Sequence, residues 1–301
     1  MEKTHFQNGI QFVWDSTSLG LLKTCPMKYK LTMIDDLVSK GKSIHLEFGI
    51  LAHSMRELYY KQRVLENLTH EEALSKTIHA AAKLGEKIPP PSKKSENNKS
   101  PYHLLLLLVT YLDLYENDPC ETYILPDGKP AVELSFKLDI GNYMLAGHID
   151  RVVRFNNKVF LTDLKTTTSS LDNDYFAQYT PNNQLSLYDF AGSHILPEED
   201  KPAGIIVDAV QILSNGIRCE RRIITRTNSQ REEWLSDFFQ WMEVNKYYHE
   251  NCNSYPMNDT ACNQFGKCTF RDNHCALIPS LRQSAIETYF EKRVWNPLDN
   301  R

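Results

Sequence analysis

Long apolar runs are missing from this 301-residue chain. The most apolar stretch runs from Leu104 to Val109 and is far too short to cross a bilayer. The first residues, Met1 to Ser16, are polar and lack the apolar core of a secretion signal. We therefore expect a cytoplasmic protein without a membrane partner. Its seven cysteines would lie in a reducing compartment, where disulfides are rare.

A strong excess of positive charge is also missing. The formal net charge is -4, which argues against a cationic coat for nucleic acid but leaves room for a local basic groove. No internal repeat is visible in the sequence. With 41% hydrophobic residues, the chain can bury one large core or two modest ones.

The order of hydrophobic patterns predicts a mixed α/β protein with helices packed on a small sheet. Period-two runs joined by Gly141-Asn142 and Asn156-Asn157 favour tight hairpins, because Asn and Gly tolerate positive φ. Residues 66–120 read as a helical insertion with a lysine-bearing loop at 87–101. Helices are predicted at 15–36 (capped by Ser16 or Thr17), 47–66, 69–84, 102–117, 182–195 and 229–249, and strands at 131–140, 143–155, 158–167, 203–213 and 218–227.

Two acids and a lysine lie in the second hairpin. Asp150 stands six residues before the turn and Asp163 six residues after it, so the two carboxylates should face each other. Adjacent carboxylates repel unless a divalent cation lies between them, and oxygen ligands suit Mg²⁺ or Mn²⁺. Lys165 shares the Asp163 face because side chains alternate along a strand. The hairpin alone leaves open a second interpretation, a solvated strand face with a Lys–Asp pair.

Further polar residues lie on helices before and after this hairpin. His53 follows Leu51-Ala52 on an amphipathic helix, and Gln184 and Tyr188 are one helical turn apart in "NNQLSLYDFAG". A single histidine on a helix is more often an ordinary surface or core residue. Only their order relative to the hairpin makes these residues candidates for a functional site.

That order resembles the RecB-like branch of the PD-(D/E)XK nucleases over roughly residues 15–280. An early helical histidine is followed by "GHID", "DLKT" and "QLSLYDF", in the family's order. The resemblance implies a single nuclease domain over residues 1–301 with a restriction-endonuclease-like core, a mixed central sheet flanked by helices. Ile149 stands where the name-giving proline would be, a frequent departure in this branch.

The resemblance also implies roles for individual residues. Asp150, Asp163, His53 and the main-chain carbonyl of Leu164 would hold one or two Mg²⁺ or Mn²⁺ ions, and Lys165 would be the catalytic lysine. The remaining positions are Gln184 and Tyr188 near the substrate phosphate and Glu133 at a recurrent acidic position on the first strand.

A cysteine-rich tail occupies residues 250–290. Cys262, Cys268 and Cys275 stand in "ACNQFGKCTFRDNHC", and Cys252 lies ten residues before Cys262. Thiolates at short spacing bind Zn²⁺ or an iron–sulfur cluster. The absence of a CxxC pair weakens the zinc reading, and three cysteines so close together are not typical of unrelated buried thiols.

The tail is similar to that of an iron–sulfur subgroup of the family, which includes AddB and CRISPR-associated and eukaryotic iron–sulfur exonucleases. "LLKTCPMKYKL" looks like the subgroup's N-terminal cysteine segment. The resemblance implies a 4Fe-4S cluster that staples the N- and C-terminal segments together, with Cys252 as an alternative to the N-terminal ligand. The implied ligands are Cys25, Cys262, Cys268 and Cys275, and Cys120 and Cys219 are read as isolated thiols.

The combined expectation is a metal-dependent deoxyribonuclease acting as an exonuclease on single-stranded DNA or duplex ends. It would serve recombination, repair or processing, with a helicase or a recombination or adaptation protein as partner. Two alternatives stay open: a non-catalytic DNA-binding subunit, and a partner-binding protein with a structural zinc tail. Candidate contacts to flanking phosphates are Lys23, Lys28, Lys30, Arg151 and Arg154.

Overall fold

The structure is a computed structural model that describes residues 4–264 and 267–298. The chain forms two compact units, each built from segments that are far apart in the sequence. The first unit takes its described residues from 4–41, 137–147, 227–264 and 267–298, and the second consists of 42–136 and 148–226. None of the helices in the described residues combines the length and apolar character needed to span a membrane.

The chain contains a mixed β-sheet, as the sequence predicts, and most of it belongs to the second unit, although residues 137–147 of β6 and β7 are counted in the first. The strand order of this sheet is β10-β9-β8-β7, and β5 and β6 also pair with β7. Neighbours β8 and β9 are parallel, whereas the other two pairs in this order are antiparallel. The strands are β5 (Glu121–Thr122), β6 (Val132–Ile140), β7 (Tyr143–Phe155), β8 (Lys158–Thr167), β9 (Ile205–Ile212) and β10 (Ile217–Ile224).

The predicted hairpin turns are confirmed. Asn156 and Asn157 have φ angles of 50° and 58°, and Gly141 has a φ of 61°. Positive φ is accessible to Asn and Gly at little cost, which is why these residues reverse the chain here. The β7–β8 register runs from Arg151 opposite Thr162 to Phe155 opposite Lys158.

Helices cover both faces of this sheet. On one face, a single core cluster joins helices α3 and α5 to the sheet. It includes Phe48, Met55 and Leu108 of the helices, Leu164 of β8 and Val210 of β9. On the other face α7 packs closely on β8, since a Cβ at Gly192 would lie 2.9 Å from the Leu161 side chain. The helices are α3 (Ile44–Leu65), α4 (His70–Leu84), α5 (Pro101–Leu114), α6 (Asn173–Ala177) and α7 (Asn183–Ile195).

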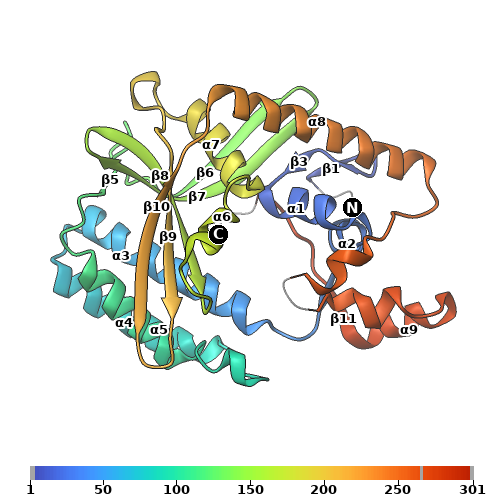
Figure 1. The fold of residues 1–301 in the computed structure, drawn as a ribbon, viewed down its shortest axis with the longest axis horizontal. Helices are drawn as coiled ribbons and strands as arrows, with labels where there is room; N and C mark the ends of the chain where they lie inside the picture. Colours follow the sequence, from blue (N-terminus) through green and yellow to red (C-terminus); the bar gives the residue numbers. More distant parts are fainter. Residues whose placement is uncertain (1–3, 265–266, 299–301) are drawn as a thin grey trace. The chain divides into compact units, whose positions relative to one another are not determined.

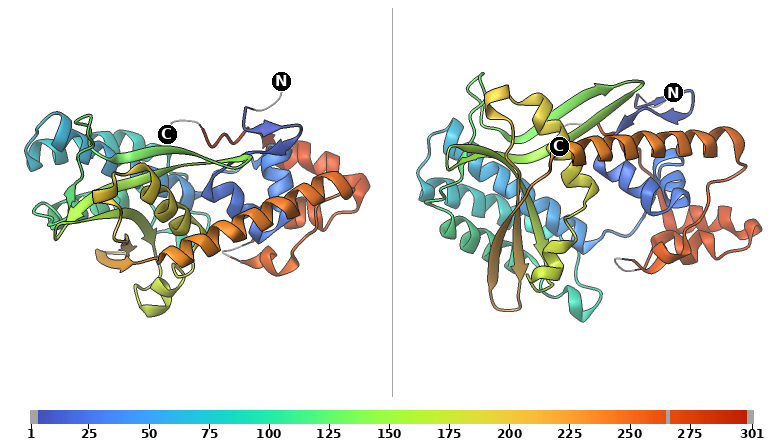
Figure 2. Two further views of the ribbon diagram at one scale, coloured as in Figure 1. Left: turned by 90° about the horizontal axis from the view of Figure 1, so that it is seen from above. Right: turned by 45° about the horizontal axis from the view of Figure 1, so that its top comes forward.

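Helices α4 and α5 lie in the stretch predicted as a helical insertion, and both pack on α3. Figure 1 shows the three together beside β9 and β10, and the same blue-to-teal group appears in both views of Figure 2. Ser43, Thr69 and Ser100 cap their N-termini by accepting backbone hydrogen bonds. Helices α4 and α5 thus share one core with the sheet instead of forming a core of their own.

The first unit is mainly helical, and Trp14, Tyr29 and Phe238 are fully buried in it. Its short strands are β1 (Phe6–Gln7), β2 (Ile10–Gln11), β3 (Val13–Trp14), β4 (Leu37–Ser39) and β11 (Phe290–Lys292). Its helices are α1 (Ser16–Thr24), α2 (Pro26–Tyr29), α8 (Asn228–Asn251) and α9 (Pro279–Tyr289), with π-helical turns at Lys30–Ile34 and Arg271–Cys275.

The sequence predicts a short helix within residues 15–36 that ends near Cys25-Pro26, and α1 does end there, but the predicted N-cap is wrong. Asp15, not Ser16 or Thr17, is the N-cap, and the helix ends before Cys25, which has extended backbone angles (φ -160°, ψ 106°). The residue before a proline is driven out of the helical region, so Pro26 starts a separate short helix.

Candidate active site

Asp150 lies at the point where the β7–β8 ladder ends. Its carboxylate Oδ2 accepts a hydrogen bond of 2.8 Å from the backbone N–H of Leu164. The last paired residues of the ladder are Arg151 and Thr162, so the side chain one residue before Arg151 bonds the β8 backbone two residues beyond Thr162. This contact fixes Asp150 between the two strands, where it is only 7% exposed.

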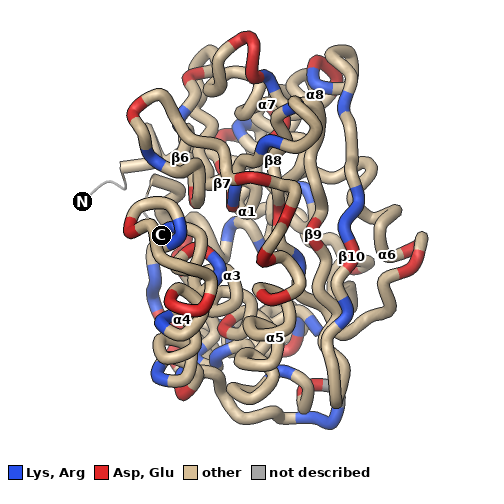
Figure 3. Tube along the Cα trace, turned by 90° about the vertical axis from the view of Figure 1, so that its left-hand side faces the viewer, with Lys and Arg blue, Asp and Glu red and all other residues tan. Residues whose placement is uncertain are grey.

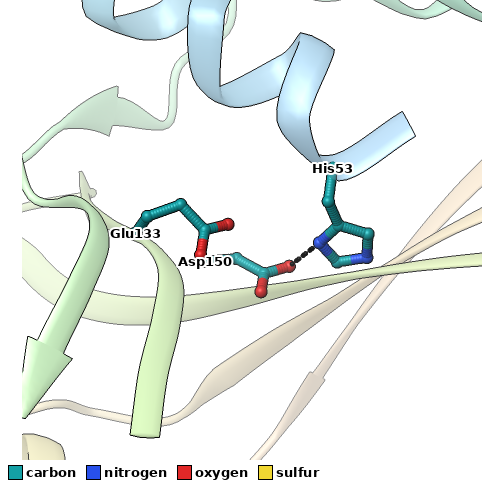
Figure 4. A group of neighbouring side chains, drawn as sticks. All are labelled: His53, Glu133 and Asp150. Carbon is teal, nitrogen blue, oxygen red and sulfur yellow. Dashed lines mark ion pairs between the residues drawn. The ribbon is translucent and has the colours of Figure 1, made fainter. Parts of the chain in front are cut away.

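His53, Glu133 and Asp150 converge from α3, β6 and β7 (Figure 4). One ligand atom from each lies within 4.8 Å of the others, and the His53 Nδ1 is 3.1 Å from the Asp150 Oδ2. Glu133 has a φ of 50°, which is rare for a residue with a long side chain. Strain of this kind persists where the surroundings enforce it, and it often marks a functional site.

Neighbouring charges set the protonation of these three groups. Burial alone would raise the pKa of Asp150, but His53, Arg56 and the Leu164 N–H hold it well below the usual range. Burial would lower the pKa of His53, but the Asp150 charge raises it above its ordinary value. Burial and the Asp150 charge together raise the pKa of Glu133 to about 7.

A second group of residues extends from Asp163 along the α7 side of the sheet. Asp163 is 1% exposed, and its Oδ2 lies 2.7 Å from Nζ of Lys165. The same Nζ donates a 2.8 Å hydrogen bond to the Gln184 Oε1, and the Gln184 Nε2 donates to the Tyr188 hydroxyl at 3.0 Å. The structure therefore brings these four predicted residues into one hydrogen-bonded line.

The two groups act on each other electrostatically. Burial raises the pKa of Asp163, Lys165 opposes this shift and the negative charge of Asp150 adds to it. Oδ1 of Asp163 has no hydrogen-bond partner among the described residues. Imidazole nitrogen and carboxylate oxygens suit Mn²⁺ or Mg²⁺, so a buried, incompletely bonded carboxylate beside His53 and Asp150 fits a divalent cation.

The side chains that would meet substrate are accessible. The His53 side chain is 30% exposed and that of Lys165 is 24% exposed. Leu164 contributes its N–H to Asp150, and the role of its main-chain carbonyl stays a prediction.

Two charged residues of the site, Arg56 and Asp208, were missed by the sequence reasoning. Arg56 NH2 lies 3.1 Å from Oδ2 of Asp150, and Arg56 NH1 lies 3.7 Å from Oδ2 of Asp208. A signal exists for both: Arg56 interrupts the apolar stripe of α3, and Asp208 is the one acid in the buried run "IIVDAVQI".

The candidate phosphate contacts are mostly engaged within the protein. Arg151 is 4% exposed, stacks on the Tyr60 ring and donates to the carbonyl of Cys120, so it is unavailable to DNA. Ion pairs also occupy Lys23, Lys30 and Arg154. Figure 3 shows basic and acidic residues interspersed along β10, as in the pairs of Arg218 and Arg222 with Glu220.

Four cysteines face a common region of the first unit. Burial raises the pKa of Cys275 to about 11, and the charges of Cys268, Cys25 and Cys262 add to this shift. Cys25 Sγ accepts from the Asn258 N–H, and the N–H of Cys268 donates to the Cys262 carbonyl at 2.9 Å. Among the described residues, no three of these sulfurs lie within 4.8 Å of one another.

The residues around these sulfurs are apolar. Cys25, Cys268 and Cys275 pack against the cluster of Met27, Leu31, Leu37, Phe270 and Phe290. Cys252 ends α8 and is not among the residues that shift the pKa of Cys275. Cys120 and Cys219 contact other clusters in the second unit.

Residues 16–277 match the model of the PD-(D/E)XK nuclease superfamily, so the chain belongs to this superfamily. The chain is similar to a solved structure of a "Putative exonuclease" from Eubacterium rectale, with 11% identity, 87% of this chain and 93% of that chain covered, and a TM-score of 0.49. A second solved structure, SSO0001, has 14% identity, 65% of this chain and 84% of that chain covered, and a TM-score of 0.30. No curated protein matches the sequence.

Proton release on cation binding should depend on Glu133. With a pKa of about 7, its carboxyl is mostly protonated at pH 6 and mostly ionised at pH 8. Because a cation displaces this proton, the affinity for Mn²⁺ should rise from pH 6 to pH 8. For the same reason, the Glu133→Gln protein should release up to one proton fewer than the wild type when it binds Mn²⁺ at pH 6.5. Calorimetry in buffers of different ionisation enthalpy measures this number. Equal proton release by both proteins would refute the assignment.

Proposed function

We propose that this chain is a Mg²⁺- or Mn²⁺-dependent deoxyribonuclease that hydrolyses phosphodiester bonds. The observation that carries the proposal is the carboxylate of Asp163, which is buried, incompletely bonded, paired with the Lys165 ammonium and subject to the charges of Asp150 and His53. A buried carboxylate of this kind binds a cation more readily than it stays bare. Membership of a nuclease superfamily supports the same conclusion.

His53, Asp150 and Asp163 would hold the cation, with the Leu164 carbonyl as a further oxygen ligand. Glu133 lies beside His53 and Asp150 and would add a fourth side chain. When bound, a divalent cation supplies an activated water and neutralises charge on the phosphate.

Lys165 would act directly on the reacting groups. Its ammonium is fixed by Asp163 on one side and by Gln184 on the other, which leaves one of its three N–H donors for a phosphate oxygen or the attacking water. A fixed positive charge stabilises the extra negative charge of the transition state. Gln184, held in turn by its bond to Tyr188, would position the scissile strand.

The finer assignments rest on the resemblance to the iron–sulfur exonucleases. On that ground the substrate is single-stranded DNA or a duplex end, and the reaction is exonucleolytic. The process would be recombination, repair or processing of DNA in the cytoplasm, with a helicase or a recombination or adaptation protein as partner.

Asp163→Asn and Lys165→Ala should abolish cleavage without abolishing DNA binding. The rate at saturating Mn²⁺ should fall about 10²–10³-fold for Lys165→Ala, because one charge-stabilising donor is lost, and at least as far for Asp163→Asn. Lys158→Ala, at the exposed far end of β8, is the matched control and should cleave normally. Labelled single strands, duplexes and circles measure the rates, and full activity in both site variants would disprove the scheme.

We also propose that Cys25, Cys262, Cys268 and Cys275 bind a 4Fe-4S cluster. The effect of the other three thiols on the pKa of Cys275, and the apolar cluster on which Cys25, Cys268 and Cys275 pack, support this ligand set. The choice of a cluster over one zinc ion rests on the resemblance to the iron–sulfur exonucleases, because both bind thiolates. The cluster would then have a structural role.

Protein purified without oxygen should be coloured and contain about four iron atoms per chain. Cys25→Ser should lose the iron and the broad visible absorbance, whereas Cys252→Ser should keep both. Metal analysis and an absorption spectrum check this. A colourless wild-type protein with about one zinc per chain, or a colourless Cys252→Ser variant, would overturn the ligand set.

A further inference from the structure

Arg56 is a buried cation with a carboxylate on each side. It is 4% exposed, and its guanidinium contacts Oδ2 of Asp150 at 3.1 Å and Oδ2 of Asp208 at 3.7 Å. A guanidinium stays charged in any protein environment, so this positive charge is permanent. It belongs to α3, the helix that also carries His53.

The far side of Arg56 is held in place by Asp208. Oδ2 of Asp208 accepts a hydrogen bond from the Tyr111 hydroxyl and lies 3.1 Å from NH2 of Arg221. Arg221 NH1 in turn contacts both carboxylate oxygens of Asp118, at 2.8 and 2.9 Å. These contacts join α3, α5 and β9 around Asp208, so Arg56 has little freedom to move.

The near side of Arg56 restricts Asp150 to one geometry. Within the described residues, all hydrogen bonds and ion pairs of Asp150 fall on Oδ2, with Arg56, His53 and the Leu164 N–H as partners. Figure 4 shows the other oxygen turned away from the His53 contact. Oδ1 is therefore the oxygen that Asp150 presents to a cation.

We propose that Arg56 is a positioning residue that holds Asp150 so that only Oδ1 meets the cation, and that its charge weakens cation binding. The predicted effect on the cleavage rate rests on the proposed function. The predicted effect on cation affinity rests only on the cation site. Binding through one oxygen would fix the position of a cation relative to Lys165. The nearby guanidinium repels the cation, so fixed geometry and weaker affinity have the same cause.

The two effects make opposite predictions for affinity and rate. In the double variant Arg56→Met/Asp208→Asn the guanidinium is lost. The Asp208 carboxylate is replaced as well, because it would otherwise be left buried without its Arg56 partner. Mn²⁺ should bind more tightly, because the lost positive charge contacts Asp150 directly, whereas the lost negative charge of Asp208 lies on the far side of Arg56. The rate at saturating Mn²⁺ should fall about 10²-fold, because Asp150 and the cation are no longer fixed. A purely structural role for Arg56 would weaken both together.

Titration calorimetry with Mn²⁺ alone and cleavage of labelled DNA measure the two quantities. Arg56→Lys keeps the charge but lacks the planar fork that spans two carboxylates, so it should bind Mn²⁺ as wild type does and cleave slowly. Arg63→Met, also on α3 but bonded to the Leu68 carbonyl, is the matched control and should change neither quantity.

Unchanged or weaker Mn²⁺ binding in a double variant with a wild-type circular-dichroism spectrum would overturn the proposal, as would an unchanged rate. If the double variant does not fold, a wild-type rate in Arg56→Lys overturns it and a reduced rate with unchanged Mn²⁺ affinity supports it. A wild-type protein that binds Mn²⁺ but cleaves no DNA would refute the proposed function, while the affinity comparison would still decide the role of Arg56.

Discussion

The candidate site depends on the ionised carboxylate of Asp150. Burial favours the neutral acid, and three donors on Oδ2 reverse that preference: Arg56, His53 and the N–H of Leu164. Through this one oxygen, α3, β7 and β8 are tied together where the antiparallel ladder ends. Removing one partner of such a buried charge typically costs about 3–5 kcal/mol, so the contact serves stability as well as chemistry.

Asp163 is as deeply buried, yet its environment has the opposite effect. It has Lys165 as its ion-pair partner, the negative charge of Asp150 acts on it, and its pKa moves up while that of Asp150 moves down. Two neighbouring carboxyls with opposite shifts are typical of sites that divide chemical roles between them. Asp150 is ionised with or without a cation, whereas a cation would stabilise the ionised form of Asp163. Asp150 and Asp163 both belong to the second unit, whereas the four candidate cluster ligands belong to the first.

The local parts of this picture could be predicted from the sequence. Alternation along β8 predicted the shared face of Asp163 and Lys165, and helical spacing predicted the contact of Gln184 with Tyr188. Asn-Asn and Gly-Asn predicted the turns because few other residues accept positive φ. The Arg56–Asp208 contact could not be predicted, because it joins distant segments and no periodic pattern encodes it. The positive φ of Glu133, whose carboxylate lies near that of Asp150, likewise follows from no pattern in the sequence.

The location of the cation tests the central claim most directly. Anomalous scattering from crystals soaked in Mn²⁺ would reveal it without relying on activity. The account predicts a peak within coordination distance, about 2.0–2.3 Å, of Oδ1 of Asp150 and of an Asp163 oxygen, with His53 beside it. A peak ligated by Oδ2 of Asp150, or a Mn²⁺ site that excludes Asp163, would contradict it.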